Sequence, residues 1–217
     1  MQLYAHPFSS YCQKALIAFY ENALPYELRM LGPGHDDVAA EHARLWPLGR
    51  MPVLVDDGRT VVESTIIIEY LDLHHPGPVR FLPQDPRIAL DVRMMDRFFD
   101  NYVMAPMMRI VFDALRPEGV RDPRGVEEAR ALLDTAYRWL DERMAHRVWA
   151  AADVFSLADC AAAPSLFYAD WVHPIDAGLS GTRAYRARLL ARPSFARAVD
   201  EARPYRSYFP LGAPDRD

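Results

Sequence analysis

Residues 51–71 read MPVLVDDGRTVVESTIIIEYL, and this stretch decides the fold. The runs 53–55 and 60–62 are rich in β-branched residues and are separated by Asp56-Asp57-Gly58-Arg59. They therefore predict a short antiparallel hairpin with a glycine-containing turn. Pro52 lacks an N–H, so it fits a strand start or edge, and the peptide bond before it can be cis at modest cost.

The helix behind this hairpin is expected to begin at Ser64, whose hydroxyl can cap its first turn. Ile67, Ile68 and Leu71 supply a buried stripe at helical spacing. Glu63 and Ser64 then lie at the positive end of a helix, beside exposed backbone. Such a site is suited to the carboxylate and amine of a small peptide.

The residues before the hairpin predict a strand, a helix and a second strand. Gln2–Ala5 is expected to be a strand, residues 11–22 a helix and residues 25–30 a strand, which is the size of a parallel βαβ unit. Residues 31–48 are irregular and polar, with a weak helical pattern over 38–44. The first part of the chain is therefore a small mixed sheet, βαβ then ββα, with helices on its faces.

The residues after the hairpin change in character. Residues 76–86 are rich in proline and glycine and predict a linker, which divides the chain into domains 1–75 and 87–217. The second domain is expected to be all-helical, because its apolar residues recur at helical spacing. We expect helices over 87–108, with a kink at Pro106, over 125–145, from Ser156 onward, over 183–190 and over 194–202.

Ser156 and Asp159 have the spacing of a capping box, in which each side chain accepts a hydrogen bond from the other residue's N–H. We interpret this motif as a folding signal for the helix that follows. Cys160, in alanine-rich sequence, is expected to be a small buried apolar residue.

The composition is that of an ordinary globular protein, with 217 residues, 51% hydrophobic and 25% charged. No apolar run is long enough to cross a membrane, and Met1–Tyr4 lacks the pattern of a signal peptide, so we expect a cytoplasmic protein with no membrane partner. Cys12 and Cys160 are too few for a disulfide framework and are expected to be reduced. The net charge of −5 disfavours nucleic acid as a partner.

Taken together, the chain resembles the cytosolic glutathione S-transferase family, in particular bacterial members with a serine-type N-terminal motif. Three segments carry the resemblance: His6–Cys12, which reads HPFSSYC; Met51-Pro52 with Glu63–Leu71; and Phe155–Asp159, which reads FSLAD. The resemblance implies an α/β N-terminal thioredoxin-like domain (βαβ-ββα) followed by an all-α helical domain. It also implies glutathione as co-substrate and a homodimer.

The resemblance also assigns glutathione-binding roles to individual residues. Met51 would pair its backbone with the cysteinyl part of glutathione, next to a cis Pro52. Glu63 would face the γ-glutamyl amino group, while Ser64 would face its carboxylate. His42, Arg44 and Arg50 are candidates for the glycyl carboxylate or the outer site, with no order among them.

The catalytic position implied by the resemblance is Ser9, with Ser10 as the alternative. A thiol titrates near 8.5, and the thiolate is the nucleophile. A hydroxyl that donates to the sulfur would stabilise the charged form by roughly 1.5–3 kcal/mol, or about one to two pKa units. The simpler interpretation of Ser9 is that it only caps a helix.

Cys12 leaves a further alternative open, because Ser9-Ser10-Tyr11-Cys12 resembles a Cys-x-x-Cys redox motif whose first cysteine is replaced. The sequence departs from the family at Trp46, before Pro47-Leu48-Gly49, where asparagine is common.

Several residues could line a pocket for a hydrophobic co-substrate, and Phe8, Met108, Arg109 and Phe112 are the principal candidates. Further candidates for this lining are Tyr4, Met104, Tyr168 and Trp171. His74-His75 has no second ligand pair at suitable spacing, so no metal site is expected.

The sequence therefore predicts a glutathione transferase that activates bound glutathione for attack on a small hydrophobic electrophile. Conjugation, isomerisation and dehalogenation remain open, because each of them uses the same thiolate. The alternatives are a non-catalytic or regulatory protein of the stringent-starvation type on the same fold, and thiol–disulfide chemistry at Cys12.

Overall fold

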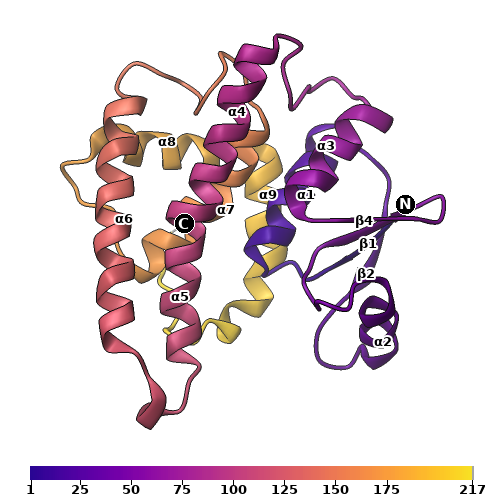
Figure 1. Ribbon diagram of the computed structural model, residues 1–217, viewed down its shortest axis with the longest axis horizontal. Helices are drawn as coiled ribbons and strands as arrows, with labels where there is room; N and C mark the ends of the chain where they lie inside the picture. The colour runs from indigo at the N-terminus through magenta and orange to yellow at the C-terminus, as the bar shows by residue number, and fades with distance from the viewer. Residues whose placement is uncertain (217) are drawn as a thin grey trace.

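The computed structural model describes residues 1–216. Its first part contains β1 (Gln2–Ala5), α1 (Ser10–Glu21), β2 (Glu27–Met30), α2 (Asp36–Leu45), β3 (Val53–Asp56), β4 (Arg59–Val62) and α3 (Ser64–His74). The four strands form one sheet in the order β2-β1-β3-β4, with β1 and β2 parallel and the other two pairs antiparallel. The predicted βαβ unit followed by a ββα unit is confirmed (Figure 1).

The two faces of this sheet pack on different helices because side chains alternate along each strand. Leu3 pairs in register with Leu54, and both are buried in the cluster that includes α1 and α3. Tyr4 pairs with Val53, and both pack instead with Val38 of α2. Figure 1 shows α1 and α3 on the side of the sheet toward the helical domain, with α2 set apart from them.

The second part is helical over the described residues. Its elements are α4 (Pro86–Phe98), the π-helix η1 (Phe99–Met104), α5 (Ala105–Ala114), the 3₁₀ turn η2 (Glu118–Val120), α6 (Pro123–Met144), α7 (Leu157–Val172), α8 (Ser180–Leu190), α9 (Pro193–Ala202) and the 3₁₀ segment η3 (Arg203–Tyr208). Between α3 and α4, residues 75–85 form neither helix nor strand. The last residue of the predicted second domain (87–217), Asp217, lies outside the described residues.

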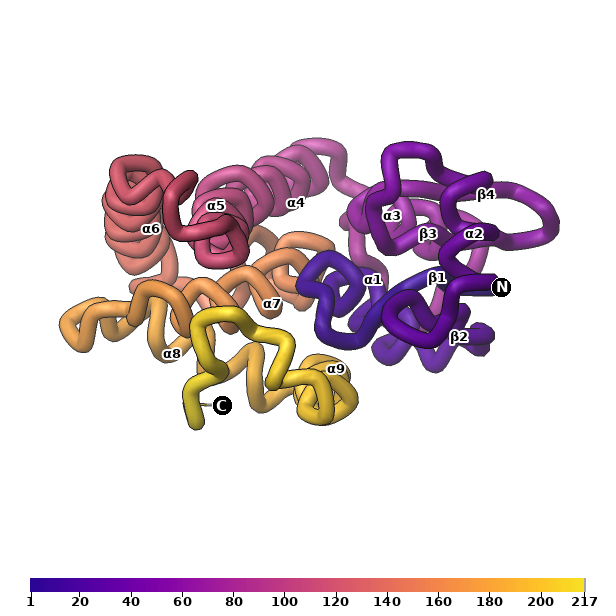
Figure 2. The backbone as a smooth tube through the Cα atoms, turned by 90° about the horizontal axis from the view of Figure 1, so that it is seen from below, coloured from indigo at the N-terminus to yellow at the C-terminus, as the bar shows by residue number. Residues whose placement is uncertain are grey.

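Helix α7 is the centre of the molecule, since all 16 of its residues are buried. It packs against α1 of the first part and against α4, η1 and α8 of the second. Figure 2 shows α7 between α1 and α8, with the C-terminal segment passing nearby. The predicted capping box is present: the Asp159 carboxylate accepts a hydrogen bond from the Ser156 N–H, and the Ser156 side chain accepts one from the Asp159 N–H.

The predicted helix over 87–108 differs from the structure in two respects. The helical path runs from Pro86 to Ala114, and it contains the π-helix η1, which ends two residues before Pro106 and which the sequence did not predict. Pro106 follows η1 within this continuous path and has no N–H to donate to the carbonyl of the preceding turn. A π-helix admits one extra residue per turn, and η1 thereby changes which side chains of this segment face the first part of the chain.

Candidate active site

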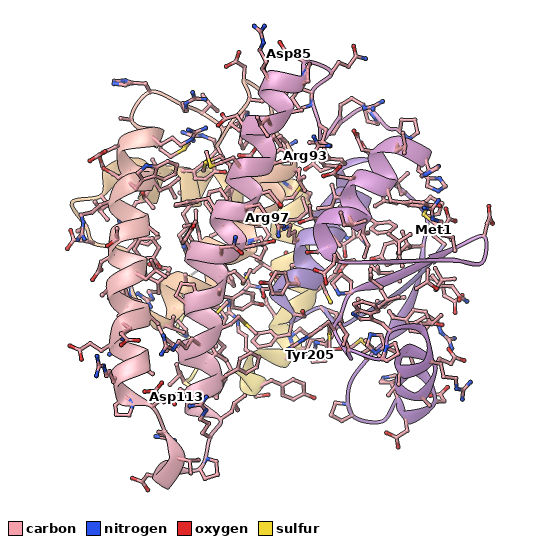
Figure 3. The ribbon with its side chains drawn as sticks, in the orientation of Figure 1. Met1, Asp85, Arg93, Arg97, Asp113 and Tyr205 are labelled. Carbon is pink, nitrogen blue, oxygen red and sulfur yellow. The ribbon has the colours of Figure 1, made fainter. Side chains whose placement is uncertain are left out.

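A cleft of about 800 Å³ lies between the sheet domain and the helices. One side is formed by residues 8–11, Trp46, residues 49–52 and Glu63-Ser64. The other side is formed by residues of α4, η1 and α5, together with Tyr168 and Tyr208–Pro210. Figure 3 labels Arg97 of α4 and Tyr205 of η3, which lie on the side of the helical part that faces the sheet domain.

Ser9 and Ser10 both line this cleft, at the start of α1. Ser9 is the N-cap of α1, and its Oγ accepts a hydrogen bond from the Cys12 N–H at 3.4 Å. Because the oxygen accepts, the Ser9 hydroxyl keeps its own proton available for donation. Capping and donation to a sulfur are therefore compatible at Ser9, while Ser10 is buried as the first residue of the helix.

The loop that presents Ser9 is held by hydrogen bonds from both domains. His6 Nδ1 accepts from the Phe8 N–H at 3.1 Å, and burial lowers the pKa of His6, so a neutral ring fits this role. Gln13 Nε2 donates to the Pro7 carbonyl and to the Tyr168 hydroxyl, each at 3.0 Å. The Tyr168 hydroxyl in turn donates to the Phe8 carbonyl at 3.2 Å. The loop position thus depends on α7 as well as on α1.

The Met51–Pro52 peptide bond is cis, which confirms the prediction from the sequence. Met51, Pro52 and Arg50 all line the cleft. His42 is buried, and its Nε2 lies 2.9 Å from the Arg50 carbonyl, which can only accept. His42 therefore supports this loop from behind and does not line the cleft, and neither does Arg44.

Glu63 and Ser64 lie together at the start of α3 and line the cleft, with Glu63 exposed and Ser64 buried. The structure corrects the expectation that Ser64 caps the helix: Ser64 is its first residue, and Glu63 is the N-cap without a side-chain cap bond. Glu63 has φ of 70°, in the left-handed region that side chains disfavour. Residues held in this way cluster at functional sites.

The wall opposite is largely apolar. The predicted residues Met108, Arg109, Phe112 and Tyr168 line it, and Met107, Val111, Leu115, Tyr208, Phe209 and Pro210 add to it. The predicted residue Phe8 also lines the cleft, from the loop before α1 on the sheet side. Tyr4, Met104 and Trp171, which the sequence also suggested, do not line the cleft: each is buried, and the Tyr4 hydroxyl is bonded to Glu41. Trp171 instead packs behind Phe8 and Phe209.

Cys12 lies outside the cleft lining and is fully buried. Burial raises the pKa of its thiol to about 11, although hydrogen bonding with Ser9 acts in the opposite direction. A thiol in this state has little thiolate at neutral pH. These observations oppose thiol–disulfide chemistry at Cys12, and Cys160 is equally buried, as expected.

Several lining residues were missed by sequence reasoning. Tyr11 is one, and burial raises its pKa to about 12, so its hydroxyl is protonated at neutral pH. Arg97 of α4 and Asp100 and Asn101 of η1 also line the cleft. Tyr11 follows directly on the serines, which was an available signal. No sequence pattern indicated that residues 208–210 line the cleft, because their position depends on the path of the chain after α9.

Within residues 1–216 there is no cluster of three or more histidine, cysteine, aspartate or glutamate side chains arranged to hold a metal ion. In the same residues, no helix combines the length and apolarity needed to cross a membrane.

Comparison with known proteins agrees with this architecture. The chain is 31% identical to a glutathione S-transferase from Methylobacterium radiotolerans, whose structure was solved in complex with glutathione sulfonate. The match covers 91% of this chain and 93% of that one, with a TM-score of 0.78. It is also 28% identical to a probable maleylacetoacetate isomerase of Vibrio cholerae, covering 93% of this chain and 96% of the relative. A stringent starvation protein A homolog of Haemophilus ducreyi is 27% identical, covering 94% and 92%.

Two family models match the two parts of the fold. Residues 3–79 match the N-terminal domain of glutathione S-transferase, and residues 123–188 match its C-terminal domain. Because these matches span more than half of the chain and the 31% identical relative aligns along nearly its whole length, the chain belongs to the glutathione S-transferase family.

Proposed function

We propose that this chain is a glutathione transferase, which binds glutathione in the interdomain cleft and directs its thiolate at a small hydrophobic electrophile. The observation that carries this proposal is that Ser9, the cis Met51–Pro52 peptide and the Glu63-Ser64 pair border a single cleft. The similarity to a family member solved with glutathione sulfonate supports glutathione as the ligand.

The charges along the sheet side of the cleft suit the tripeptide. Glutathione carries one ammonium and two carboxylates. Glu63 is exposed at the cleft and offers a carboxylate to the ammonium, while Ser64 offers its hydroxyl and N–H to the adjacent carboxylate. Arg50, also exposed at the cleft, would bind the glycyl carboxylate, and Met51 between them would pair its backbone with the cysteinyl residue.

In this arrangement the cysteinyl sulfur would lie toward the start of α1. The Ser9 hydroxyl donates to the sulfur and favours its charged form, and the thiol proton leaves to solvent. With an aryl halide, the sulfur's electron pair forms the new carbon–sulfur bond, and the halide departs with the electron pair of the bond that breaks. Ser10 and Tyr11 provide further hydroxyls at the same end of the cleft.

The apolar wall of α5 and the C-terminal segment would hold the electrophile beside the sulfur. Phe8, Met108 and Phe112 offer contact surface there without a second nucleophile. Conjugation, dehalogenation and isomerisation share this geometry, and the similarity to a probable maleylacetoacetate isomerase supports including isomerisation. Family membership likewise supports a cytoplasmic homodimer.

The principal alternative is a binding or regulatory protein of the stringent-starvation type, to which the chain is also similar. A cleft filled by a segment of the helical domain would favour that alternative. Residues 208–210 border the cleft and leave about 800 Å³ open, a volume that accommodates a ligand of this size. The open cleft therefore favours the enzyme.

The test combines binding and turnover. Calorimetry should detect binding of glutathione and no binding of the dipeptide Cys-Gly, which lacks the γ-glutamyl group that Glu63 and Ser64 would hold. Turnover of 1-chloro-2,4-dinitrobenzene at millimolar glutathione should accompany it. Absence of both binding and turnover would contradict the proposal, and glutathione binding without turnover of any halide, epoxide or enone would favour the binding protein.

A further inference from the structure

Lys14 is the only lysine in the sequence, and its side chain is fully buried in α1. A buried ammonium must be paired to be tolerated. Its Nζ lies 2.6 Å from Asp96 Oδ1, 2.9 Å from Asp100 Oδ2 and 2.9 Å from Thr65 Oγ1. These three side chains match the three N–H groups of an ammonium, so Lys14 is held from three directions.

Arg97 closes this group of residues on the cleft side. Its Nη2 lies 2.6 Å from Asp96, 2.6 Å from Asp100 and 2.5 Å from Thr65. Two cations therefore face two carboxylates around one hydroxyl. We call Lys14, Thr65, Asp96, Arg97 and Asp100 the Lys14 cluster; Figure 3 labels its outermost member, Arg97.

The Lys14 cluster joins four elements that border the cleft, α1, α3, α4 and η1. Lys14 belongs to α1, which begins directly after Ser9. Thr65 belongs to α3 and follows Glu63 and Ser64 without an intervening residue. Asp96 and Asp100 belong to α4 and η1 of the other domain. A single ammonium thus sets the relative positions of the helix with the serines, the helix with the acidic pair and the opposing wall.

Stability alone does not explain why charges occupy this position. A buried ion pair is often no more stabilising than well-packed apolar side chains of the same volume, whereas it does fix geometry. Glu63 next to the cluster adopts φ of 70°, a conformation that persists only where the surroundings hold it. The hydrogen bond from Lys14 to Thr65, two residues after Glu63, is such a constraint.

We propose that Lys14 is a positioning residue for the glutathione site, which holds Glu63 and Ser64 in place through Thr65 and against the other domain through Asp96 and Asp100. The inference rests on the proposed function, because the site it concerns is the one for glutathione. Lys14 does not line the cleft and acts only through its partners.

This role predicts a selective kinetic effect. Loss of the constraint on Thr65 misplaces the groups that hold the γ-glutamyl end, which weakens binding of glutathione in the ground and transition states alike. The KM for glutathione should rise, while kcat and the KM for the aryl halide should stay close to wild type. A general loss of structure would instead change all three parameters and the melting temperature together.

The experiment compares Thr65→Val with Thr65→Ser. Valine keeps the volume of threonine but removes the hydroxyl that binds Lys14, whereas serine retains that hydroxyl. We expect the KM for glutathione to rise about tenfold in Thr65→Val, the equivalent of one hydrogen bond to a charged group, and to stay near wild type in Thr65→Ser. Thr65 does not line the cleft, so the valine methyl does not replace a ligand contact.

A second variant, Lys14→Met with Asp96→Asn, removes one cation and one carboxylate together and keeps the charge balanced. It should raise the KM for glutathione at least as much as Thr65→Val. An unchanged KM for glutathione in folded Thr65→Val, or equal changes in Thr65→Val and Thr65→Ser, would overturn the inference. If wild-type protein neither binds glutathione nor turns over the halide, the proposed function itself fails, and this inference fails with it.

Discussion

Replacing Ser9 with alanine removes the hydroxyl at the start of α1 that both caps the helix and faces the cleft. Two effects are expected, and the structure separates their sizes. The cap bond to the Cys12 N–H is long, at 3.4 Å, so the loss of folding stability should fall at the lower end of the usual range, near 0.5–1 kcal/mol. The effect on the thiol is larger, because a hydrogen bond to a charged group contributes roughly 1.5–3 kcal/mol.

The larger effect corresponds to about one to two pKa units on bound glutathione. A thiol near 8.5 without the hydroxyl would then titrate at roughly 6.5–7.5 with it. At neutral pH the ionised fraction falls from about 0.2–0.8 in the wild type to about 0.03 in Ser9→Ala, whereas above about pH 9 both are mostly ionised. The loss of rate should therefore be greatest at neutral pH and should shrink as pH rises.

The assay is the pH dependence of kcat/KM for 1-chloro-2,4-dinitrobenzene at saturating glutathione, which reports the pKa of the enzyme–glutathione complex. Ser9→Gly serves as a control for the cap, because glycine is tolerated at an N-cap nearly as well as serine. It should show the same shift in pKa as Ser9→Ala with less loss of stability. Ser10→Ala should leave the pKa in place.

An unchanged pKa in both Ser9 variants would refute the role given to Ser9. A shift in Ser10→Ala alone would transfer that role to Ser10. An unchanged pKa in all three variants would remove the hydroxyls of Ser9 and Ser10 from the activation of the thiol and direct attention to Tyr11, which follows them and also lines the cleft.

Three further predictions concern two buried groups, Cys12 and Asp159. In the folded protein at about pH 8, Cys12 should not react with iodoacetamide, because its pKa is raised to about 11; after unfolding it should react as a free cysteine. Because the pKa of this thiol is higher in the folded protein than in the unfolded one, the thiol favours folding below about pH 8.5 and loses this contribution as pH rises. Wild type should therefore lose about 2 kcal/mol of unfolding free energy relative to Cys12→Ala between about pH 8 and about pH 10, measured by urea unfolding. Asp159→Ala leaves four donors without their acceptor, the Ser156 N–H and hydroxyl, the Ala150 N–H and the Tyr185 hydroxyl. It should cost about 3–5 kcal/mol of unfolding free energy, and a loss below about 1 kcal/mol in urea unfolding would contradict the role of the capping box.

Patterns between nearby residues predicted much of the fold. The hairpin of β3 and β4, the helix after it and the capping box of α7 each depend on residues a few positions apart. Alternation and helical spacing describe which side of one element is buried, and that is local information. The same reasoning gave one helix over 87–108 with a kink at Pro106 and did not predict the π-helix η1, which ends two residues before that proline.

The candidate site was predictable in part for the same reason. Ser9, Ser10, Met51, Pro52, Glu63 and Ser64 lie in short motifs, and all of them border the cleft. His42 was a candidate for binding the glycyl carboxylate or the outer site, yet its ring is hydrogen-bonded to the Arg50 carbonyl from behind the cleft. Which way a side chain on α2 points is decided by how that helix packs on the sheet, and the sequence around His42 does not encode it.

The sequence by itself determined the order of elements, the cis Met51–Pro52 peptide, the capping box and the motifs that form one side of the cleft. Only the tertiary structure decided the other side, where residues 208–210 return beside Phe8 and where η1 turns Asp100 toward Lys14. These partners are separated by dozens to about 200 positions along the chain. Their meeting depends on the packing of α7 between the two domains, so no local pattern of residue types could specify it.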